Sequence, residues 1–283
     1  MKETVLITGA NSFIAKHLIP LLEKNYNVKL LTRSPKAENE FSWDISTKQI
    51  DERALDNVQH IVHLAGSKLN DGTPLTEERK KLVYDSRIGA ALLILDKLKE
   101  RKQTIKTFVS ASAIGYYGFT DQTLEIDENG KKGFGFGAEL SHDWEVAADQ
   151  FKIDGIAEHV SKIRVSIVLG NEGGIFPVYY NMVNQNPSVV EQGRGDYVPW
   201  NHVEDMAGIF AFAVEHQLDG VFNSVAPMPA TQHDIFASIG NALGKTNVEI
   251  KKFEGQHLVS KKIEDLDYQF KYKEIATAIK SLV

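Results

Sequence analysis

The stretch TVLITGANSFIAKHL, residues 4–18, decides the fold class. Its first part, TVLIT (4–8), is a short apolar and β-branched run that predicts a buried strand. A glycine then marks a tight turn, and the apolar spacing from Phe13 onward predicts a helix. A strand, a glycine turn and a helix N-terminus together form an anion site, because free backbone N–H groups and the helix dipole point toward a phosphate.

The glycine loop departs from the G-x-x-G-x-x-G spacing that dinucleotide sites favour. Only Gly9 is present, with Ser12 at the second glycine position and Ala15 at the third. Ala15 is small enough for close helix packing, whereas Ser12 places a side chain where backbone usually approaches a pyrophosphate. The alternative is an ordinary turn with Asn11 in a left-handed conformation. If the loop binds a dinucleotide, its contacts are predicted at Gly9, Asn11, Ser12, Phe13 and Ile14.

Strands and helices alternate from this stretch to about residue 165. Further strands are predicted over 28–32, 60–64, 107–112 and 159–165, and helices over 13–24, 76–99 and 138–151. This alternation predicts an α/β fold with a doubly wound parallel sheet covered on both faces. After Val165, Gly and Pro become frequent and the helical segments shorten (203–216, 231–243, 273–283). We therefore expect a nucleotide-binding domain over 1–165 and a smaller substrate or lid region over 166–283, with a return of the chain to the sheet left open.

The residues after the next strands indicate which dinucleotide would bind. Strand 28–32 ends at Arg33, where an NAD site usually carries an acid for the ribose hydroxyl. An arginine there pairs instead with a 2′-phosphate, so the sequence favours NADP(H) over NAD(H). Asp44 and Ile45 stand where adenine would lie, although an Asp after a short strand is also a common turn residue. Leu64, Ala65 and Gly66 end strand 60–64 and would let the cofactor backbone pass close by.

Composition excludes several classes of function. The chain has 283 residues, a net charge of -6 and no cysteine, so disulfides, thiol chemistry and thiolate metal sites are excluded. The mild acidity offers no footprint for nucleic acid or for a membrane surface. His60 and His63 point to opposite faces of a strand, which argues against a metal site. With no leader and no apolar span apparent, we expect a cytoplasmic protein that acts on a small-molecule substrate.

The stretch VSASAIGYYG (109–118) gathers hydroxyl groups at the end of a buried strand. These motifs together resemble the extended short-chain dehydrogenase/reductases, the NAD-dependent epimerase/dehydratase family. TGANSFIA (8–15) is similar to its T-G-x-x-G-F-I-G motif, DNVQHIVHLAG (56–66) to its D-x-x-x-H-x-A-G stretch, and SASAIGYYG (110–118) to its S-S-x-x-V-Y-G stretch. RVSIVLG (164–170) and VPWNHVEDMAGIF (198–210) extend the match over nearly the whole chain.

The chain looks most like an atypical branch called epimerase family proteins, with a short C-terminal domain of unknown function. The resemblance implies a Rossmann-type sheet with a smaller C-terminal substrate or lid region. It also implies a catalytic serine at Ser112 and a tyrosine and lysine spaced Y-x-x-x-K on a helix. In GFGFGAELSHDWE (133–145), however, Phe136 stands at the tyrosine position and Leu140 at the lysine position.

Two replacements for the missing pair are open. Tyr117, which aligns with the family's Y-G, or Tyr116 supplies a phenol, or Glu139 or Asp143 acts as acid or base from the helix. A tyrosine with no cation beside it has a pKa near 10 and suits donating a proton better than taking one. The alternative is that both tyrosines only shape the site.

On the substrate side, Arg164, Gly174 and Trp200 are the predicted contacts. The first hypothesis is an NADP(H)-dependent reductase or epimerase acting on a small polar substrate, with Ser112, Tyr117 and Tyr116 as catalytic residues. The second is a dinucleotide-binding regulator or sensor without turnover. The resemblance implies a homodimer formed through helices 76–99 and 138–151. Four charged residues on these helices, Lys80, Lys81, Glu139 and Asp143, argue instead for a monomer, so both states stay open.

Overall fold

A computed structural model describes residues 2–69, 72–118, 125–250, 253, 255 and 257–283. The chain divides into two compact units. The first unit comprises 1–118, 132–163 and 210–221, and the second comprises 119–131, 164–209 and 222–283. The division is therefore not a single boundary near residue 165, because 210–221 returns to the first unit.

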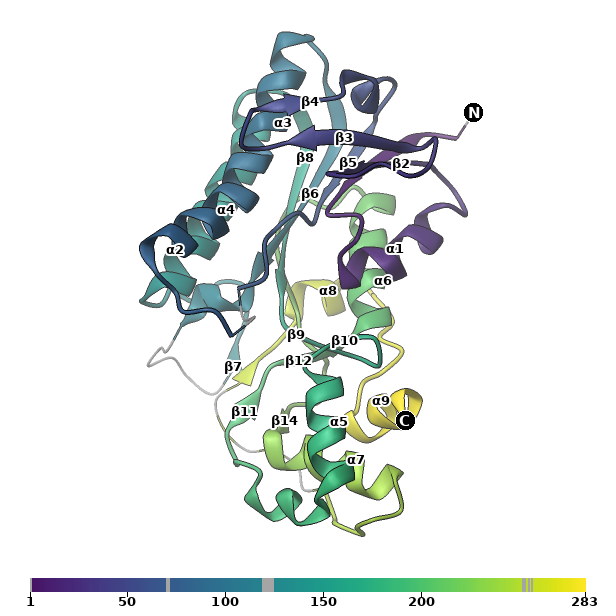
Figure 1. Ribbon diagram of the computed structural model, residues 1–283, viewed down its shortest axis with the longest axis vertical. Helices are drawn as coiled ribbons and strands as arrows, with labels where there is room; N and C mark the ends of the chain where they lie inside the picture. The colour runs from purple at the N-terminus through teal and green to yellow at the C-terminus, as the bar shows by residue number, and fades with distance from the viewer. Residues whose placement is uncertain (1, 70–71, 119–124, 251–252, 254, 256) are drawn as a thin grey trace. The chain divides into compact units, whose positions relative to one another are not determined.

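A large, mostly parallel sheet is the centre of the first unit (Figure 1). Its eight strands, in sheet order, are β13 (Gly220–Ser224), β8 (Ala157–Val165), β6 (Ile105–Ala113), β5 (His60–His63), β1 (Thr4–Thr8), β2 (Asn27–Thr32), β3 (Glu40–Asp44) and β4 (Gln49–Ile50). All residues of β1 are buried, as expected for a strand flanked on both edges and covered on both faces. The order β3-β2-β1-β5-β6-β8 is the doubly wound order, with its switch point between β1 and β5.

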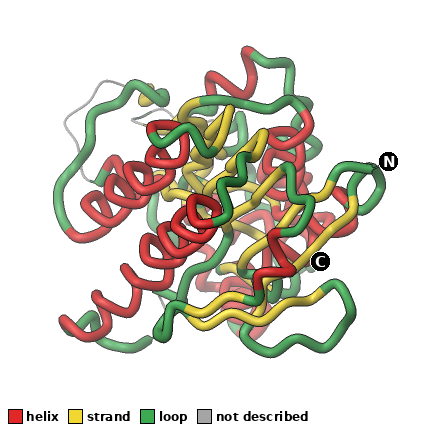
Figure 2. Tube along the Cα trace, turned by 90° about the horizontal axis from the view of Figure 1, so that it is seen from above, coloured by secondary structure: helices red, strands yellow, loops and turns green. Residues whose placement is uncertain are grey.

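Helices cover the first unit's sheet. They are α1 (Phe13–Leu22), η1 (Glu52–Leu55), α2 (Glu77–Tyr84), η2 (Asp85–Gly89), α3 (Ala90–Glu100), η3 (Ile114–Tyr117) and α4 (Phe136–Ile153). Figure 1 shows α3 and α4 together on one face and α1 on the other, and Figure 2 shows helices on both sides of the strands. The buried faces of α3 and α4 share one apolar core with β1, β2, β5 and β6.

The helix predicted over 76–99 is interrupted in its middle. It runs as α2 and α3, joined by the π-helical turn η2. A π turn admits one extra residue per turn, and such turns occur often at functional sites. The periodicity of the sequence did not reveal it.

The second unit is built from small sheets and short helices. Its elements are β7 (Glu125–Ile126), β9 (Ile167–Gly170), β10 (Gly173–Gly174), α5 (Phe176–Gln185), η4 (Pro187–Gln192), β11 (Tyr197–Val198), β12 (Trp200–His202), β14 (Ala230–Thr231), α7 (Gln232–Ala242), β15 (His257–Leu258), α8 (Lys261–Asp265) and α9 (Ile275–Leu282). Helix α6 (Val203–Glu215) begins in this unit and ends in the first. The apolar core of the second unit joins α5, α7 and α9 around Trp200.

Candidate functional site

The glycine loop brings the ends of β1 and β5 into close backbone contact. Gly9 has a φ of 68°, which L side chains rarely adopt. A Cβ atom on Gly9 would lie 2.5 Å from the carbonyl oxygen of Leu64 and 2.8 Å from the amide nitrogen of Ala65. Only glycine fits here. The left-handed position of the turn is therefore Gly9, and Asn11 does not have a positive φ.

Ser12 has a defined role at the start of α1. It is the N-cap, and its Oγ accepts a hydrogen bond from the Ala15 N–H at 3.2 Å. The hydroxyl is thereby turned onto the helix. Phe13 and Ile14 open the helix, so their N–H groups have no partner within it and the positive end of the dipole faces the loop.

A buried hydrogen-bonded chain holds the carboxyl ends of β1 and β5 together. Leu64 and Ala65 donate their N–H groups to Thr8 Oγ1 at 3.2 and 3.1 Å. Thr8 Oγ1 lies 2.9 Å from His63 Nδ1, and His63 Nε2 lies 2.9 Å from the Arg87 carbonyl oxygen. A carbonyl only accepts, so His63 carries its proton on Nε2 and Thr8 donates to Nδ1. Burial lowers the pKa of His63 to about 4, so the ring is neutral at pH 7.

Arg33 and Asp44 line one surface hollow of about 530 Å³ at the β2–β3 side of the sheet. Arg33 is exposed directly after β2 and forms no ion pair with a described residue. Asp44 Oδ1 accepts bonds from the N–H and the hydroxyl of Ser46 at 2.8 and 2.6 Å, and these bonds lower its pKa. Asp44 therefore forms an Asx turn, as the turn alternative expected. Ile45 follows it and is partly buried.

Ser112 is paired with a carboxylate that the sequence reading did not select. Ser112 Oγ donates to Glu145 Oε1 at 2.7 Å, and the residues are 2% and 8% exposed. Glu145 lies on α4, among Trp144, Ala147 and Ala148 on the buried face. The helical period of DWEVAA places Glu145 on that face, and this was the signal available in the sequence.

The two tyrosines differ in exposure. Tyr117 is 2% exposed, whereas Tyr116 is partly exposed, and their rings meet edge to face at 5.5 Å. Both belong to the short turn η3, directly after β6. A catalytic role for either tyrosine stays a prediction, and exposure favours Tyr116 as the one in reach of a ligand.

The first turns of α4 carry Phe136 and Leu140. Lys80 Nζ lies 5.8 Å from the centre of the Phe136 ring, and Leu140 is 4% exposed. The carboxylates considered as replacements are already bonded. Glu139 accepts from Lys132 at 2.5 Å, which lowers its pKa, and Asp143 accepts from Tyr84.

The predicted substrate residues belong to the second unit. Trp200 is 1% exposed and lies in that unit's core, with its Nε1–H donating to the Met228 carbonyl at 3.1 Å. Arg164 is 3% exposed and donates to the Glu128 carbonyl at 3.4 Å. Gly174, with a φ of 70°, pairs with Leu169 just before α5. Their part in substrate binding stays a prediction.

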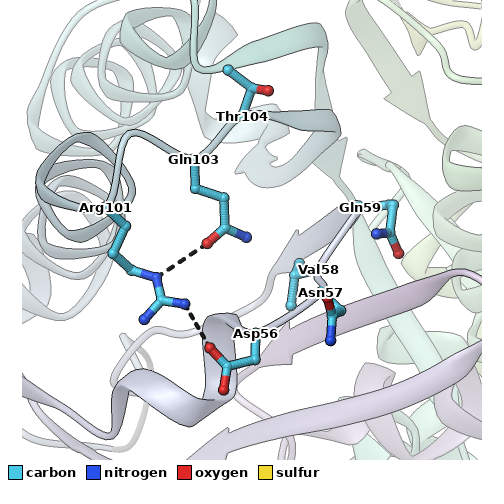
Figure 3. A pocket seen from close by; sticks show the side chains of 7 residues that line it. All are labelled: Asp56, Asn57, Val58, Gln59, Arg101, Gln103 and Thr104. Atoms are coloured by element: carbon cyan, nitrogen blue, oxygen red, sulfur yellow. Dashed lines mark hydrogen bonds and ion pairs between the residues drawn. The ribbon is translucent and has the colours of Figure 1, made fainter.

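A second hollow, of about 470 Å³, lies at the opposite edge of the first unit's sheet (Figure 3). The hollow is lined by residues 56–59, 101, 103 and 104, which directly precede β5 and β6. Arg101 donates to Gln103 at 3.1 Å and to Asp56 at 2.6 Å, so its guanidinium is already engaged. Ligands of doubly wound sheets bind beyond the carboxyl ends of the strands. The candidate cofactor site is therefore the edge at Gly9 and not this hollow.

Within the described ranges, no group of His, Asp and Glu side chains could hold a metal ion. Likewise, no helix of the described chain is long and apolar enough to cross a membrane.

Comparison with known proteins identifies the family of this chain. The sequence model of the NAD dependent epimerase/dehydratase family matches residues 5–224. The chain belongs to this family. The sequence-based resemblance and the Rossmann-type α/β fold are therefore confirmed.

Relatives of this epimerase/dehydratase chain span its whole length. Human epimerase family protein SDR39U1 is 28% identical over 302 residues, covering 99% of both chains. Epimerase family protein ML0860 of Mycobacterium leprae is 28% identical, covering 98% of this chain and 95% of that protein.

Solved structures show the same fold. Human SDR39U1 (isoform 2) with NADPH has a TM-score of 0.75 and 26% identity, covering 99% of this chain and 98% of that one. The nucleoside-diphosphate sugar epimerase from Corynebacterium glutamicum has a TM-score of 0.79 and 25% identity. This chain aligns over 100% of its own length and spans 58% of that protein.

Proposed function

We propose that this protein binds NADP(H) at the carboxyl edge of β1, β2 and β5. We further propose that it works as an oxidoreductase or nucleotide-sugar-epimerase-like enzyme on a small polar substrate. The observation that carries the proposal is the Gly9 turn, where backbone meets backbone at the start of a helix. That cradle suits a pyrophosphate, which needs close approach to backbone N–H groups. The full-length relative with NADPH supports the same ligand.

The preference for the phosphorylated cofactor rests on Arg33. Its exposed guanidinium follows β2 and lines the hollow that also contains Asp44. Asp44 is turned onto Ser46, so it is engaged locally rather than with Arg33. A guanidinium binds a phosphate through two parallel hydrogen bonds, which a ribose hydroxyl does not match.

The chemistry of the reacting centre is assigned to the end of β6. A bound nicotinamide gives or takes a hydride. In the reduction direction, the Tyr116 or Tyr117 phenol donates the proton to the oxygen of the substrate carbonyl that receives the hydride. Ser112 Oγ, whose own proton goes to Glu145, accepts a hydrogen bond from the substrate hydroxyl that results. Glu145 accepts the Ser112 hydrogen bond and so orients the Ser112 hydroxyl.

A fluorescence titration tests the cofactor assignment. We expect NADPH to bind about tenfold or more tightly than NADH, and Arg33→Gln to remove that difference. Arg53→Gln is the control, because its side chain is 77% exposed and paired with Asp51 on the same unit. Failure of both dinucleotides to bind would refute the proposal, and tighter binding of NADH would refute the role of Arg33.

A second candidate function is a dinucleotide-binding regulator without turnover. It is favoured by Phe136 and Leu140, which stand where the family resemblance places the tyrosine and lysine. A phenyl ring moves no proton, and a leucine lowers no pKa.

Turnover separates the two functions. NADPH oxidation is followed with a panel of carbonyl compounds, and nicotinamide reduction with the NADP⁺-loaded protein and nucleotide sugars. An enzyme gives a signal that Ser112→Ala reduces, and comparison of Tyr116→Phe with Tyr117→Phe assigns the phenol. Turnover unaffected by both phenylalanine variants would remove the tyrosines from the mechanism.

A further inference from the structure

Arg87 is a partly buried cation beside Gly66, close to the carboxyl end of β5 in the first unit. It lies in the π turn η2, where its Nη1 donates to the Val83 carbonyl at 3.2 Å and its Nη2 to the Ser67 carbonyl at 3.0 Å. Its Cζ lies 5.2 Å from the centre of the Trp144 ring, a cation–π contact. Burial lowers the pKa of Arg87 to about 10, so the guanidinium remains charged at pH 7.

The guanidinium has no carboxylate partner among the described residues. It donates to carbonyl oxygens and to the Ser86 hydroxyl at 3.5 Å, and repulsion from the like-charged Arg79 adds to burial in lowering its pKa. By contrast, Lys162, a buried cation of the same unit, is paired with Asp149. A charge removed from water is costly unless an opposite charge offsets it. Arg87 thus suits an anion from outside the chain.

The position of Arg87 indicates which anion that is. A Cβ on Gly66 would lie 2.9 Å from Arg87 Cζ, so the guanidinium lies directly against the backbone of Gly66. Gly66 follows Leu64, whose carbonyl touches Gly9. In the doubly wound order, β5 opens the half of the sheet that binds the nicotinamide side of a dinucleotide.

The surrounding residues hold the guanidinium at this position. Trp144 lies one turn after Leu140 on α4, and its ring packs against the Arg87 guanidinium. His63 Nε2–H donates to the carbonyl oxygen of Arg87 itself, at 2.9 Å, and anchors the wide turn. The cation that α4 lacks at position 140 is therefore present nearby, on the neighbouring helical segment.

We propose that Arg87 binds a phosphate oxygen of the dinucleotide, on the nicotinamide side of the pyrophosphate. This inference rests on the proposed function, because it requires that the protein bind a nicotinamide dinucleotide. It adds a binding residue that the family motifs quoted above do not contain.

Titrations of Arg87→Gln with three ligands test the assignment. Loss of a hydrogen bond to a charged group weakens binding by about tenfold to a hundredfold, and we expect this loss for both NADPH and NADH. We expect less than a twofold change for 2′,5′-ADP, which carries the adenosine half alone. Arg33→Gln should behave in the opposite way, weakening NADPH and 2′,5′-ADP but not NADH.

The control variant is Arg101→Gln, which removes an arginine at the opposite edge of the same sheet and should leave all three affinities unchanged. Arg87→Lys keeps the charge without the planar fork and should lie between the parent and Arg87→Gln. It also replaces Arg87→Gln in the titrations if that variant shows a lowered melting temperature.

The outcomes separate this inference from the proposed function. If the parent binds neither dinucleotide, the proposed function fails. If the parent binds NADPH and Arg87→Gln binds it equally well, only the role of Arg87 is overturned. Equal weakening of 2′,5′-ADP would overturn the nicotinamide-side placement. Weaker binding of UDP with NADPH affinity intact would overturn the assignment and place a substrate anion at Arg87.

Discussion

A buried carboxylate of the second unit and a partly buried arginine of the first unit have different kinds of partner. In the second unit, Asp205 is 2% exposed and accepts the backbone N–H groups of Lys271 and Tyr272, both at 2.8 Å. In the first unit, Arg87 donates to carbonyls and to a hydroxyl and faces no described carboxylate. Both charged groups lie within folded units. Only the Asp205 carboxylate accepts a backbone N–H group on each of its oxygens, and these N–H groups come from a segment distant in the sequence.

The difference distinguishes a structural charge from a ligand-binding one. Asp205 ties α6 to the segment before α9, so its bonds are part of the fold of the second unit. Glu128 does the same with the N–H groups of Asn223 and Lys262, at 3.0 and 3.3 Å. Removing such an acceptor leaves buried donors without partners, whereas removing an unpaired cation relieves a desolvation cost.

The largest effect is expected for Asp205→Ala. Two backbone N–H groups would lose their acceptor, which costs about 4 kcal/mol of unfolding free energy. Urea unfolding measures this loss. Asp265→Ala is the control, because its carboxylate is 62% exposed and paired with Lys261, and its removal should cost below about 0.5 kcal/mol. A loss as small as that of the control would contradict the structural role.

The next effect is a pH dependence at His63, which stands beside Arg87. The pKa of His63 falls from 6.5 to about 4 on folding, so the unfolded chain binds the proton more readily. The stabilisation is complete above pH 6.5 and is lost as pH falls toward 4, reaching about 3 kcal/mol in total.

The difference in unfolding free energy between the parent and His63→Gln, measured from pH 7 to pH 4, isolates this contribution. His142→Gln, at a histidine whose side chain is 44% exposed, should retain the pH dependence of the parent. A His63→Gln variant with the same pH dependence as the parent would show that His63 is not the group responsible.

A comparable effect is expected for Gly9→Ala, at the loop that Arg87 adjoins through Gly66. An alanine at positive φ costs about 1 kcal/mol, and the contact with the Leu64 carbonyl adds about 1–3 kcal/mol. Gly155→Ala is the matched control, because Gly155 has a φ of 67° and a Cβ there would meet nothing within 4 Å. The two variants are compared by thermal unfolding and by NADPH titration. The difference between them isolates the contribution of the contact with the Leu64 carbonyl. Equal behaviour would show that the close approach is relaxed at no cost.

The smallest effect is expected for Arg87→Met. The methionine keeps an apolar contact with Trp144 and removes a cation without a counter-charge, so the unfolding free energy should change by less than about 1 kcal/mol. NADPH affinity should nevertheless fall as it does in Arg87→Gln. A loss of stability comparable to that of Asp205→Ala would place Arg87 with the structural charges.

Local sequence patterns predicted most of the first unit. The apolar run 4–8 is β1, the helix expected over 138–151 is the interior of α4, and the strand expected over 107–112 lies within β6. In the second half of the chain, the helical segments expected over 203–216, 231–243 and 273–283 correspond to α6, α7 and α9. The strands of the second unit were not foreseen, because they are two to four residues long, too short to show a period. The return of 210–221 to the first unit depends on long-range packing.

The sequence by itself determined the family, the α/β fold and the candidate cofactor loop, because strand runs, a glycine turn and helical periods are local properties. Only the tertiary structure decided which distant residues meet. It places Arg87 against Gly66, Glu145 on Ser112, and His63 between Thr8 and the π turn. Burial and hydrogen-bond partners belong to these contacts between distant segments, so charge state, tautomer and the absence of a described counter-charge at Arg87 could be read only from the folded chain.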